Sequence, residues 1–501
     1  MTVLNFIVLL PILNAIVIAL GAPARKSALL SAWTQLALTV VALIGYKPAT
    51  PGGFAYGSTW AVAPEWGLNL TFGADGLALV MLLLTAVVTV AAVWVTPKID
   101  KRENLFYACV LLISGGAAGA FASVDMFFFY AFHELALIPT FLLIGIWGHG
   151  ERQVAAWKIT IYLAVGSMIL LVGLAKLYLA FPEGTFLGSA HSFDMIKMAA
   201  ALKENPNLIS PEVQGGIYIW LLVGFGVLIS LFPFHSWAAP AYASAPTPVA
   251  MLHSGVLKKF GLYGLIRIAV PMLPEGAKVW MNLLLVLLVA NILYIGLVTI
   301  AQKKLDWMLG YSSVMHMGYI FLGIAAGNAI GVTGASLLML GHGLSIAALF
   351  AMCGYLRQKS TSLAFTNFGG VAKGAPFLGY AFGMAAFASI GLPGFANFAG
   401  ETMVFFGAFK SGPAGTLNLA GIQIATVCGL WGVVISAVYM LRAYRQIFQG
   451  EALANVEGIK DPPCTVRRSV MLLLAVLLIA GVWPKSMLNF IQPSVEALIG
   501  K

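Results

Sequence analysis

Four titratable residues lie deep inside long apolar stretches of this 501-residue sequence. Glu134 lies about eight residues into one stretch, which places it about 12 Å from the end of a helix that rises about 1.5 Å per residue. Lys258 and Lys259 lie near the middle of another stretch, and Glu401 lies near the end of a third. A charge at such a depth in lipid costs several kcal/mol unless it is paired or hydrated. These four residues are therefore the first candidates for chemistry.

Acids and lysines buried along one line suit a proton or cation relay. Desolvation disfavours the charged form of both kinds of group, which allows acids and lysines to exchange protons near neutral pH. A structural ion pair that holds helices together is the alternative interpretation of the same residues. A relay needs titratable groups of both signs, and the sequence supplies both.

Four histidines extend this set of candidates. His253, His316 and His342 fall within predicted helices, and His235 falls at a predicted helix break. A single helix histidine is more often a satisfied core residue, but His316 and His342 occupy consecutive helices at similar depth, which favours a relay. We expect His235 either to stabilise the break or to share charge through water. His133 points to a different helix face from that of its neighbour Glu134.

Other kinds of site are not indicated by the sequence. It contains no GxGxxG fingerprint, no P-loop and no HExxH motif, so we expect no cofactor and no metal in this chain. The formal charge of +10 is spread between apolar runs and forms no single basic block, which argues against nucleic acid as a partner. No CxxC or iron–sulfur spacing joins the four cysteines, which are Cys109, Cys353, Cys428 and Cys464.

The elements that position these residues are membrane helices. The sequence is 60% hydrophobic and 9% charged, which places the chain in the lipid bilayer. A spanning helix needs about 20 mostly apolar residues. About fourteen such runs predict an all-α membrane protein, and they lie at approximately 3–22, 28–46, 75–96, 105–123, 125–147, 157–180, 216–237, 248–271, 279–301, 307–327, 331–355, 375–410, 418–446 and 468–490.

Helices 7 and 12 of this series are predicted to be broken. The seventh runs into Pro233, and the twelfth contains Gly391-Leu392-Pro393-Gly394. Such breaks survive in lipid only where protein or a water-filled cavity shields them. The breaks fall in fourth place in two blocks of five helices that start on opposite faces, which is typical of inverted repeats.

The predicted organisation has four parts. They are helices 1 to 3 in residues 1–104, a first repeat of helices 4 to 8 in 105–273, a second repeat of helices 9 to 13 in 274–446, and a loop with helix 14 in 447–501. Lys and Arg gather in alternate loops, which predicts a multi-pass protein of a bacterial inner membrane with both termini outside. Arg267 is expected to reach the outer face from a helix end, and Asp75 is expected to start the third helix or to lie at an interface.

Several motifs resemble the antiporter-like subunits of respiratory complex I, in order and at family spacing from roughly residue 70 to residue 450. The motifs are Phe72-Gly73-Ala74-Asp75-Gly76-Leu77, Leu231-Phe232-Pro233-Phe234-His235-Ser236-Trp237, Ala245-Pro246-Thr247-Pro248, Ser254-Gly255-Val256-Leu257-Lys258-Lys259, Tyr311-Ser312-Ser313-Val314-Met315-His316, Gly341-His342-Gly343, Gly391-Leu392-Pro393-Gly394 and Gly400-Glu401. The acid on the twelfth helix is similar to that of the M-type subunits in particular.

The resemblance implies roles for three of the buried charges. Glu134, Lys259 and Glu401 match the fifth-helix, eighth-helix and twelfth-helix members of the family's hydrated axis. The seventh-helix lysine of the family is missing, because Leu228 stands at its expected place. Lys258 facing Glu134, or a histidine acting through water, are the two substitutes that the sequence offers.

The function implied by the resemblance is that of a proton-translocating membrane-arm subunit of NADH-quinone oxidoreductase. Quinone reduction elsewhere in the complex would drive proton transfer along the buried Glu, Lys and His side chains. The implied partners are other membrane-arm subunits and the lipid bilayer, with NADH and quinone bound by other subunits. A subunit of a multi-subunit cation/proton antiporter and a membrane arm of a ferredoxin- or hydrogenase-linked complex are the alternatives, because they share the fold.

Overall fold

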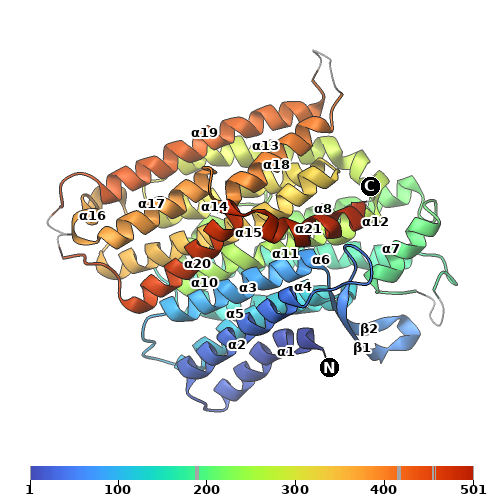
Figure 1. Cartoon of the computed structure of the whole chain (residues 1–501), viewed down its shortest axis with the longest axis horizontal. Coiled ribbons are helices and arrows are strands. Elements are labelled where there is room, and N and C mark those ends of the chain that lie inside the picture. The colour runs from blue at the N-terminus through green and yellow to red at the C-terminus, as the bar shows by residue number, and fades with distance from the viewer. Residues whose placement is uncertain (1, 187–190, 414–418, 454–455, 457, 500–501) are drawn as a thin grey trace.

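Long apolar helices run side by side along the horizontal axis of Figure 1, because a bilayer leaves backbone groups no partner outside the helix itself. The computed structural model describes residues 2–186, 191–413, 419–453, 456 and 458–499. Eleven helices of this described part are long and apolar enough to cross a membrane. The first, eighth and twelfth predicted spans are formed by shorter or divided helices. The expectation of an all-α membrane body of about fourteen spans is confirmed.

The first six spans agree closely with the apolar runs. Their bounds are Val3–Ala19 (α1), Ala24–Ile44 (α2), Gly76–Val95 (α3), Glu103–Ala122 (α4), Met126–Trp147 (α5) and Arg152–Leu179 (α6). Asp75 begins α3, since its carboxylate accepts a hydrogen bond of 2.9 Å from the backbone N–H of Ala78. The expected helix-start role of Asp75 is therefore confirmed.

A small β-hairpin and a short helix lie at one end of the bundle, and neither was anticipated. The antiparallel strands are Ala55–Ala63 (β1) and Leu68–Ala74 (β2), joined by the 3-10 turn Pro64–Trp66 (η1). The helix Met195–Glu204 (α7) lies at the same end as the hairpin (Figure 1). Both elements are too short and too polar to give the signal of a membrane span.

The seventh span is broken as expected. Helix α8 (Pro211–Ile229) ends at Ser230, whose φ of 70° is left-handed, and a turn leads to α9 (Ala238–Ser244). The eighth span follows as a helix interrupted by two π turns. Its parts are Thr247–Leu252 (α10), His253–Leu257 (η2), Lys259–Gly264 (α11), Leu265–Ala269 (η3) and Val270–Met272 (α12).

The twelfth span is also broken as expected, between α17 (Pro376–Ile390) and α18 (Ala396–Lys410). Gly391 ends α17 with a φ of 83°. The remaining elements are Pro274–Ala301 (α13), Leu305–Ala325 (α14), Ala329–Lys359 (α15), Phe365–Asn367 (η4), Val371–Gly374 (α16), Gly421–Phe448 (α19), Cys464–Val482 (α20) and Lys485–Ile499 (α21).

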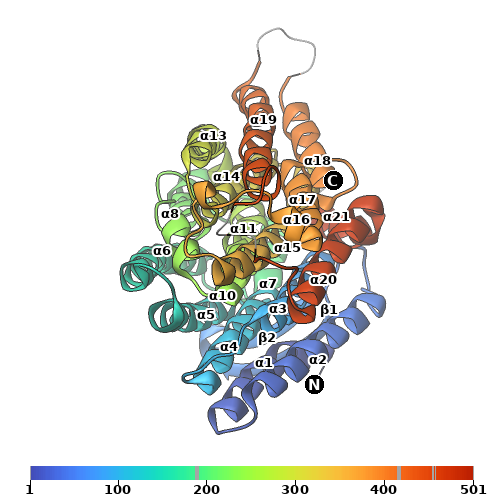
Figure 2. The same ribbon diagram turned by 90° about the vertical axis from the view of Figure 1, so that its left-hand side faces the viewer.

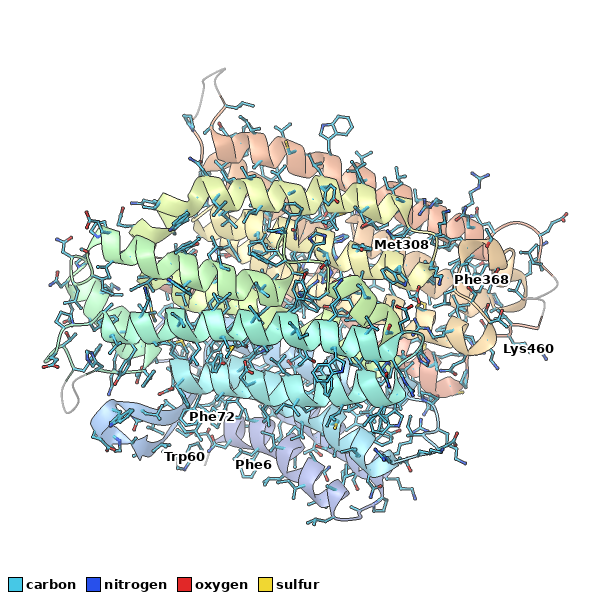
Figure 3. The ribbon with its side chains drawn as sticks, turned by 180° about the vertical axis from the view of Figure 1, so that it is seen from behind. Phe6, Trp60, Phe72, Met308, Phe368 and Lys460 are labelled. Carbon is cyan, nitrogen blue, oxygen red and sulfur yellow. The ribbon has the colours of Figure 1, made fainter. Side chains whose placement is uncertain are left out.

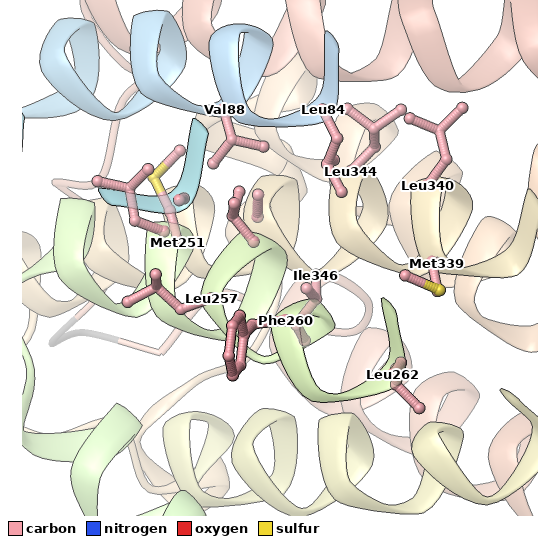
Figure 4. Packing of buried hydrophobic residues seen from close by; sticks show 14 of the residues in the cluster. Leu84, Val88, Met251, Leu257, Phe260, Leu262, Met339, Leu340, Leu344 and Ile346 are labelled. Atoms are coloured by element: carbon pink, nitrogen blue, oxygen red, sulfur yellow. The ribbon is translucent and has the colours of Figure 1, made fainter. Parts of the chain in front are cut away.

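Helices α3 and α15 form the core, because the most apolar window of each is completely buried. Figure 4 shows Leu84 and Val88 of α3 close to Leu344 of α15, with Met251 of the eighth span beside them. In Figure 2 the other helices surround this central pair. The core therefore holds the eighth span, which carries the two buried lysines, in a fixed position.

The two ends of the bundle differ in composition. Figure 3 shows Trp60 of the hairpin and Lys460 at opposite ends of the molecule. The end with Lys460 carries the loops that are rich in Lys and Arg, whereas the hairpin end carries few. The direction from one end to the other is therefore the direction across the membrane.

Candidate functional site

Lys259 lies at the centre of the molecule and is fully buried. Its Nζ donates a hydrogen bond of 2.7 Å to the carbonyl oxygen of Ser254 and lies 2.8 Å from Nδ1 of His342. The π turn that precedes Lys259 contains Ser254, and such turns alter the regular hydrogen-bond ladder of a helix. Helix geometry thus gives the lysine one fixed acceptor and one titratable neighbour.

His316 continues from His342, since the centroids of the two rings lie 5.6 Å apart. Nδ1 of His316 lies 2.7 Å from the carbonyl oxygen of Ser312, and Nε2 lies 2.8 Å from that of Ser389. Ser389 belongs to the last turn of α17, where carbonyl groups lack helical partners. A neutral imidazole has one N–H and the protonated ring has two, so two acceptors suit a ring that gains and loses a proton.

Glu401 lies beyond the break, on α18, and is 4% exposed. A Cβ atom at Gly391 would overlap Oε2 of Glu401, so the glycine leaves the space that the carboxyl occupies. Tyr319 contacts both His316 and the helix that carries Glu401: its ring centroid lies 5.7 Å from that of His316 and 5.7 Å from that of Phe405 on α18, and its hydroxyl is buried. Neither this hydroxyl nor Oε1 of Glu401 has a hydrogen-bond partner among the described residues.

Lys258 begins a second branch on the same helix. Its Nζ lies 3.4 Å from Oγ of Ser313 and 5.4 Å from the centre of the Tyr242 ring. The Tyr242 hydroxyl lies 3.4 Å from Nδ1 of His253, whose Nε2 is buried without a partner in the described part of the chain. Of the residues selected from the sequence, Lys258, Lys259, His253, His316 and His342 are thus brought into one buried group.

Glu134 lies apart from this group. Its carboxylate accepts hydrogen bonds from the hydroxyls of Ser167 and Tyr130, and it lines a cavity of about 200 Å³ between α5 and α6. No ion pair of the described residues includes it. The suggested substitute Lys258 contacts Ser313 instead, because its helix directs it toward α14.

Leu228, which stands where the family's seventh-helix lysine is expected, is buried on α8 and faces α6. Gly166 packs against Leu228, since a Cβ added at the glycine would lie 3.3 Å from a Leu228 methyl group, and Ser167 follows Gly166 directly. An apolar side chain therefore packs against the residue that precedes Ser167, whose hydroxyl bonds Glu134. Leu228 itself is 3% exposed.

The remaining histidines lie outside the buried line. His235 stacks on Phe232 at the break of the seventh span, with 5.6 Å between ring centroids. His133 stacks on Phe260 at 3.9 Å, on a different face of α5 from Glu134. Among the described residues, neither ring makes a hydrogen bond with a lysine of the eighth span.

Arg267 corrects the sequence interpretation. It was expected to reach solvent from a helix end, but it is 4% exposed and forms a 2.7 Å ion pair with Asp75. Nε and Nη2 also bond the hydroxyl of Tyr263. Its carboxylate partner comes from a helix almost two hundred residues away in the chain, and this pairing offsets the cost of burying the guanidinium.

A polar cavity of about 770 Å³ opens at the end of the bundle that is rich in Lys and Arg. Its lining includes His149, Asp306 and Arg357, and the latter two form a 2.9 Å ion pair. Burial lowers the pKa of His149, and the positive charge of Arg357 lowers it further. Ser244 also lines this cavity and is two residues from Tyr242, so the cavity ends close to the Lys258 branch.

Several contact residues could not be selected in advance. Tyr242, Ser254, Ser313 and Ser389 carry no charge, and their side chains or carbonyl groups matter only through contacts made by the fold. Tyr319 alone had a local signal, since it follows His316 by three residues and so lies on the same helix face.

Comparison with known families gives one consistent result. Residues 123–428 match the family model described as "NADH:quinone oxidoreductase/Mrp antiporter, TM". The chain is 35% identical over 459 residues to "NAD(P)H-quinone oxidoreductase chain 4 2" of Thermosynechococcus vestitus, covering 90% of this chain and 83% of the relative. It is 33% identical to "NAD(P)H-quinone oxidoreductase chain 4" of Gloeobacter violaceus, covering 87% and 80%.

Solved structures agree with these sequence matches. A chain of respiratory complex I from Thermus thermophilus with bound NADH superimposes with a TM-score of 0.86 at 26% identity, and the match covers 100% of both chains. A chain of the Mrp complex from Dietzia sp. gives a TM-score of 0.84 at 21% identity, covering 99% of this chain and 97% of that one. The second likeness concerns the fold alone.

Proposed function

This chain belongs to the NADH:quinone oxidoreductase/Mrp antiporter transmembrane family, and from that premise we propose that it is a proton-translocating membrane-arm subunit of an NADH-quinone oxidoreductase. The observation that carries the proposal is the buried contact of 2.8 Å between Lys259 and His342, with His316 next in line. A lysine and two histidines in contact can pass a proton without exposing a charge to lipid.

The proposed path crosses the membrane by way of the centre of the molecule. Protons enter from the 770 Å³ cavity and reach Lys258 and Lys259 past Tyr242 and His253. They then cross through His342 and His316 to Glu401 on the far side of the second break. The two lysines and His253 belong to the eighth span, whereas His342, His316 and Glu401 belong to α15, α14 and α18. The path therefore depends on how the two proposed repeats, 105–273 and 274–446, pack together.

Glu134 has a different proposed role. It lies on a cavity that opens between α5 and α6, apart from the lysines. No ion pair among the described residues neutralises Glu134. A change of charge in a neighbouring subunit would therefore act on this carboxyl directly, which suits it to sense that subunit electrostatically. We therefore propose other membrane-arm subunits as partners of the chain, with NADH and quinone bound elsewhere in the complex.

The proposed location is a bacterial inner membrane. The Lys- and Arg-rich end of the bundle would face the cytoplasm, and the hairpin end would face outward. The first residues of α1 and the last residues of α21 lie nearer the hairpin end in Figure 1, so both would be outside.

The relay is tested in the intact complex in inverted membrane vesicles, by measuring NADH oxidation and proton uptake together. We expect Lys259→Ala and Glu401→Gln to lower proton uptake at least tenfold, because a positioned proton carrier contributes roughly 10²–10⁴ in rate. Lys176→Ala is the matched control, since this lysine lies at the end of α6 over the Trp220 ring. Unchanged coupling in both relay variants would show that the relay assignment is wrong.

A further inference from the structure

A second cavity, of about 420 Å³, lies at the hairpin end of the molecule, away from the buried line. Segments distant in sequence enclose it: α7, the start of α3, the end of the eighth span and the C-terminal helix α21. Most of its wall is apolar, as Met195, Leu202, Met272 and Leu498 illustrate. Neither the proton path nor Glu134 uses this space.

The inner end of the cavity carries the ion pair of Asp75 and Arg267. Arg267 uses Nε and Nη2 for its bonds to Tyr263 and Asp75, and its Nη1 makes no hydrogen bond with the described residues. This Nη1 group is therefore available to donate a hydrogen bond to an acceptor that enters the cavity.

The charge of the lining is positive. Arg267 and Asp75 compensate each other, and Lys203 on α7 adds a further positive charge at the exposed rim. Among the described lining residues no second carboxylate balances Lys203. A ligand that matches this lining therefore has an anionic group that contacts Arg267 and Lys203, and an apolar part that contacts the apolar side chains of the wall.

We propose that this cavity binds an amphiphile with an anionic head group and one alkyl chain. A free inorganic anion would leave the apolar wall in contact with water, and a neutral apolar molecule would leave Nη1 of Arg267 without a partner. A fatty acid and one acyl chain of an anionic phospholipid share the required chemistry. The cavity lies at an end of the membrane-spanning bundle, where such molecules are available in the bilayer.

The test uses the intact complex in membranes and photoreactive palmitate, which carries a diazirine on its chain. We expect palmitate to label peptides of α7 and α21, and the corresponding alcohol, which lacks the anionic head, to label them weakly. Ala199→Trp fills the cavity from an exposed position on α7 and is expected to reduce labelling at least tenfold. Proton pumping should be retained, because the site and the relay are separate.

Lys203→Gln is expected to reduce labelling about twofold to fivefold at low salt, because an exposed charge contributes only a small electrostatic attraction to the anionic head group. Lys197→Gln is the matched control, since this exposed lysine is on the same helix but not in the cavity wall. Vesicles of phosphatidylglycerol and of phosphatidylcholine are used as competitors for labelling. Competition by phosphatidylglycerol alone would identify a phospholipid as the occupant, and resistance to both would identify a free fatty acid.

Equal labelling by acid and alcohol, or labelling that survives Ala199→Trp, would overturn the proposal.

Discussion

At the scale of single residues, the half-buried carboxyl of Glu134 is bonded by hydroxyl groups and not by a cation of the described residues. Hydroxyl groups of Ser167 and Tyr130 bond the carboxyl, and Leu228 fills the place where the resemblance implies a lysine. Neutral donors stabilise a carboxylate less than an ammonium group does, but they hold it in a defined position. Among the described residues, hydrogen bonds and not an ion pair therefore hold the Glu134 carboxyl in place.

Ser167→Ala tests this hydroxyl bond. Loss of a hydrogen bond of about 1 kcal/mol should change the proton affinity of Glu134 roughly fivefold and lower the rate of proton uptake by a similar factor. Ser167→Thr retains the hydroxyl and is expected to stay near the wild-type rate. The measurement is NADH-driven proton uptake as a function of pH in inverted vesicles. Wild-type behaviour of the alanine variant would show that Ser167 does not set the proton affinity of Glu134.

At the scale of elements, the helix breaks supply both space and acceptors. The end of α17 offers the Ser389 carbonyl to His316, and Gly391 makes room for Glu401. A carbonyl of an intact helix would already be bonded, and any side chain at residue 391 would meet the carboxyl. The break in the twelfth span is thus part of the site.

Comparison of Gly391→Ala with Gly394→Ala distinguishes two effects of an added methyl group, which are steric overlap with Glu401 and backbone strain. Both glycines have left-handed φ values, 83° and 99°, so alanine costs about 1 to 2 kcal/mol at either position. Only at Gly391 would the new methyl group meet Glu401, since no atom of the described residues lies within 4 Å of a Cβ at Gly394. We expect similar losses of thermal stability, and a severalfold greater loss of proton uptake for Gly391→Ala. Equal uptake in the two variants would contradict this role of Gly391.

Asp125 joins the hairpin to α5 and gives a pH-dependent prediction. Its carboxylate accepts from the backbone N–H groups of Phe127, Phe128 and Asn69, while burial raises its pKa from 3.8 to about 6. The folded protein therefore binds more protons than the unfolded chain between these values, and this residue's contribution to stability falls as pH rises through about 6.

Asp125→Asn keeps a helix-capping oxygen and removes the titration. The melting temperature of the variant relative to wild type is expected to be higher at pH 8 than at pH 5, where the folded wild-type carboxyl is largely neutral; loss of the second oxygen, which accepts from Asn69, affects both values alike. Tryptophan fluorescence of the detergent-solubilised complex during heating measures both values. A difference from wild type that is the same at the two pH values would mean that ionisation of Asp125 has no part in stability.

The elements were largely predictable from the sequence because hydropathy directly reports helices in lipid. The breaks at Pro233 and at Gly391 followed from residues that cannot continue a helix. The hairpin at 55–74 was not predictable in the same way, since its strands are short and lie at the end of the bundle, where hydropathy carries little information. The π turns around Lys258 were also missed, because no residue type specifies them.

At the scale of the whole molecule, the site was predictable as a set of residues and not as a set of contacts. Glu134, Lys259 and Glu401 were identified by the cost of burying a charge. The ion pair of Arg267 with Asp75 joins segments that only the fold brings together, so the position of Arg267 near a helix end led to a wrong prediction of its location. Tertiary packing decided the partners in each case.

The uneven distribution of Lys and Arg also makes the orientation of the whole molecule testable with native cysteines. Cys464 is exposed at the start of α20, at the Lys- and Arg-rich end, whereas Cys109 and Cys353 are buried and Cys428 is half-buried among apolar residues of α19. Because positive loops stay in the cytoplasm, we expect a charged maleimide, which does not cross membranes, to label inverted vesicles and not right-side-out vesicles. Cys464→Ala should abolish the label, and labelling from the outer face would reverse the orientation and with it the direction of the proposed proton path.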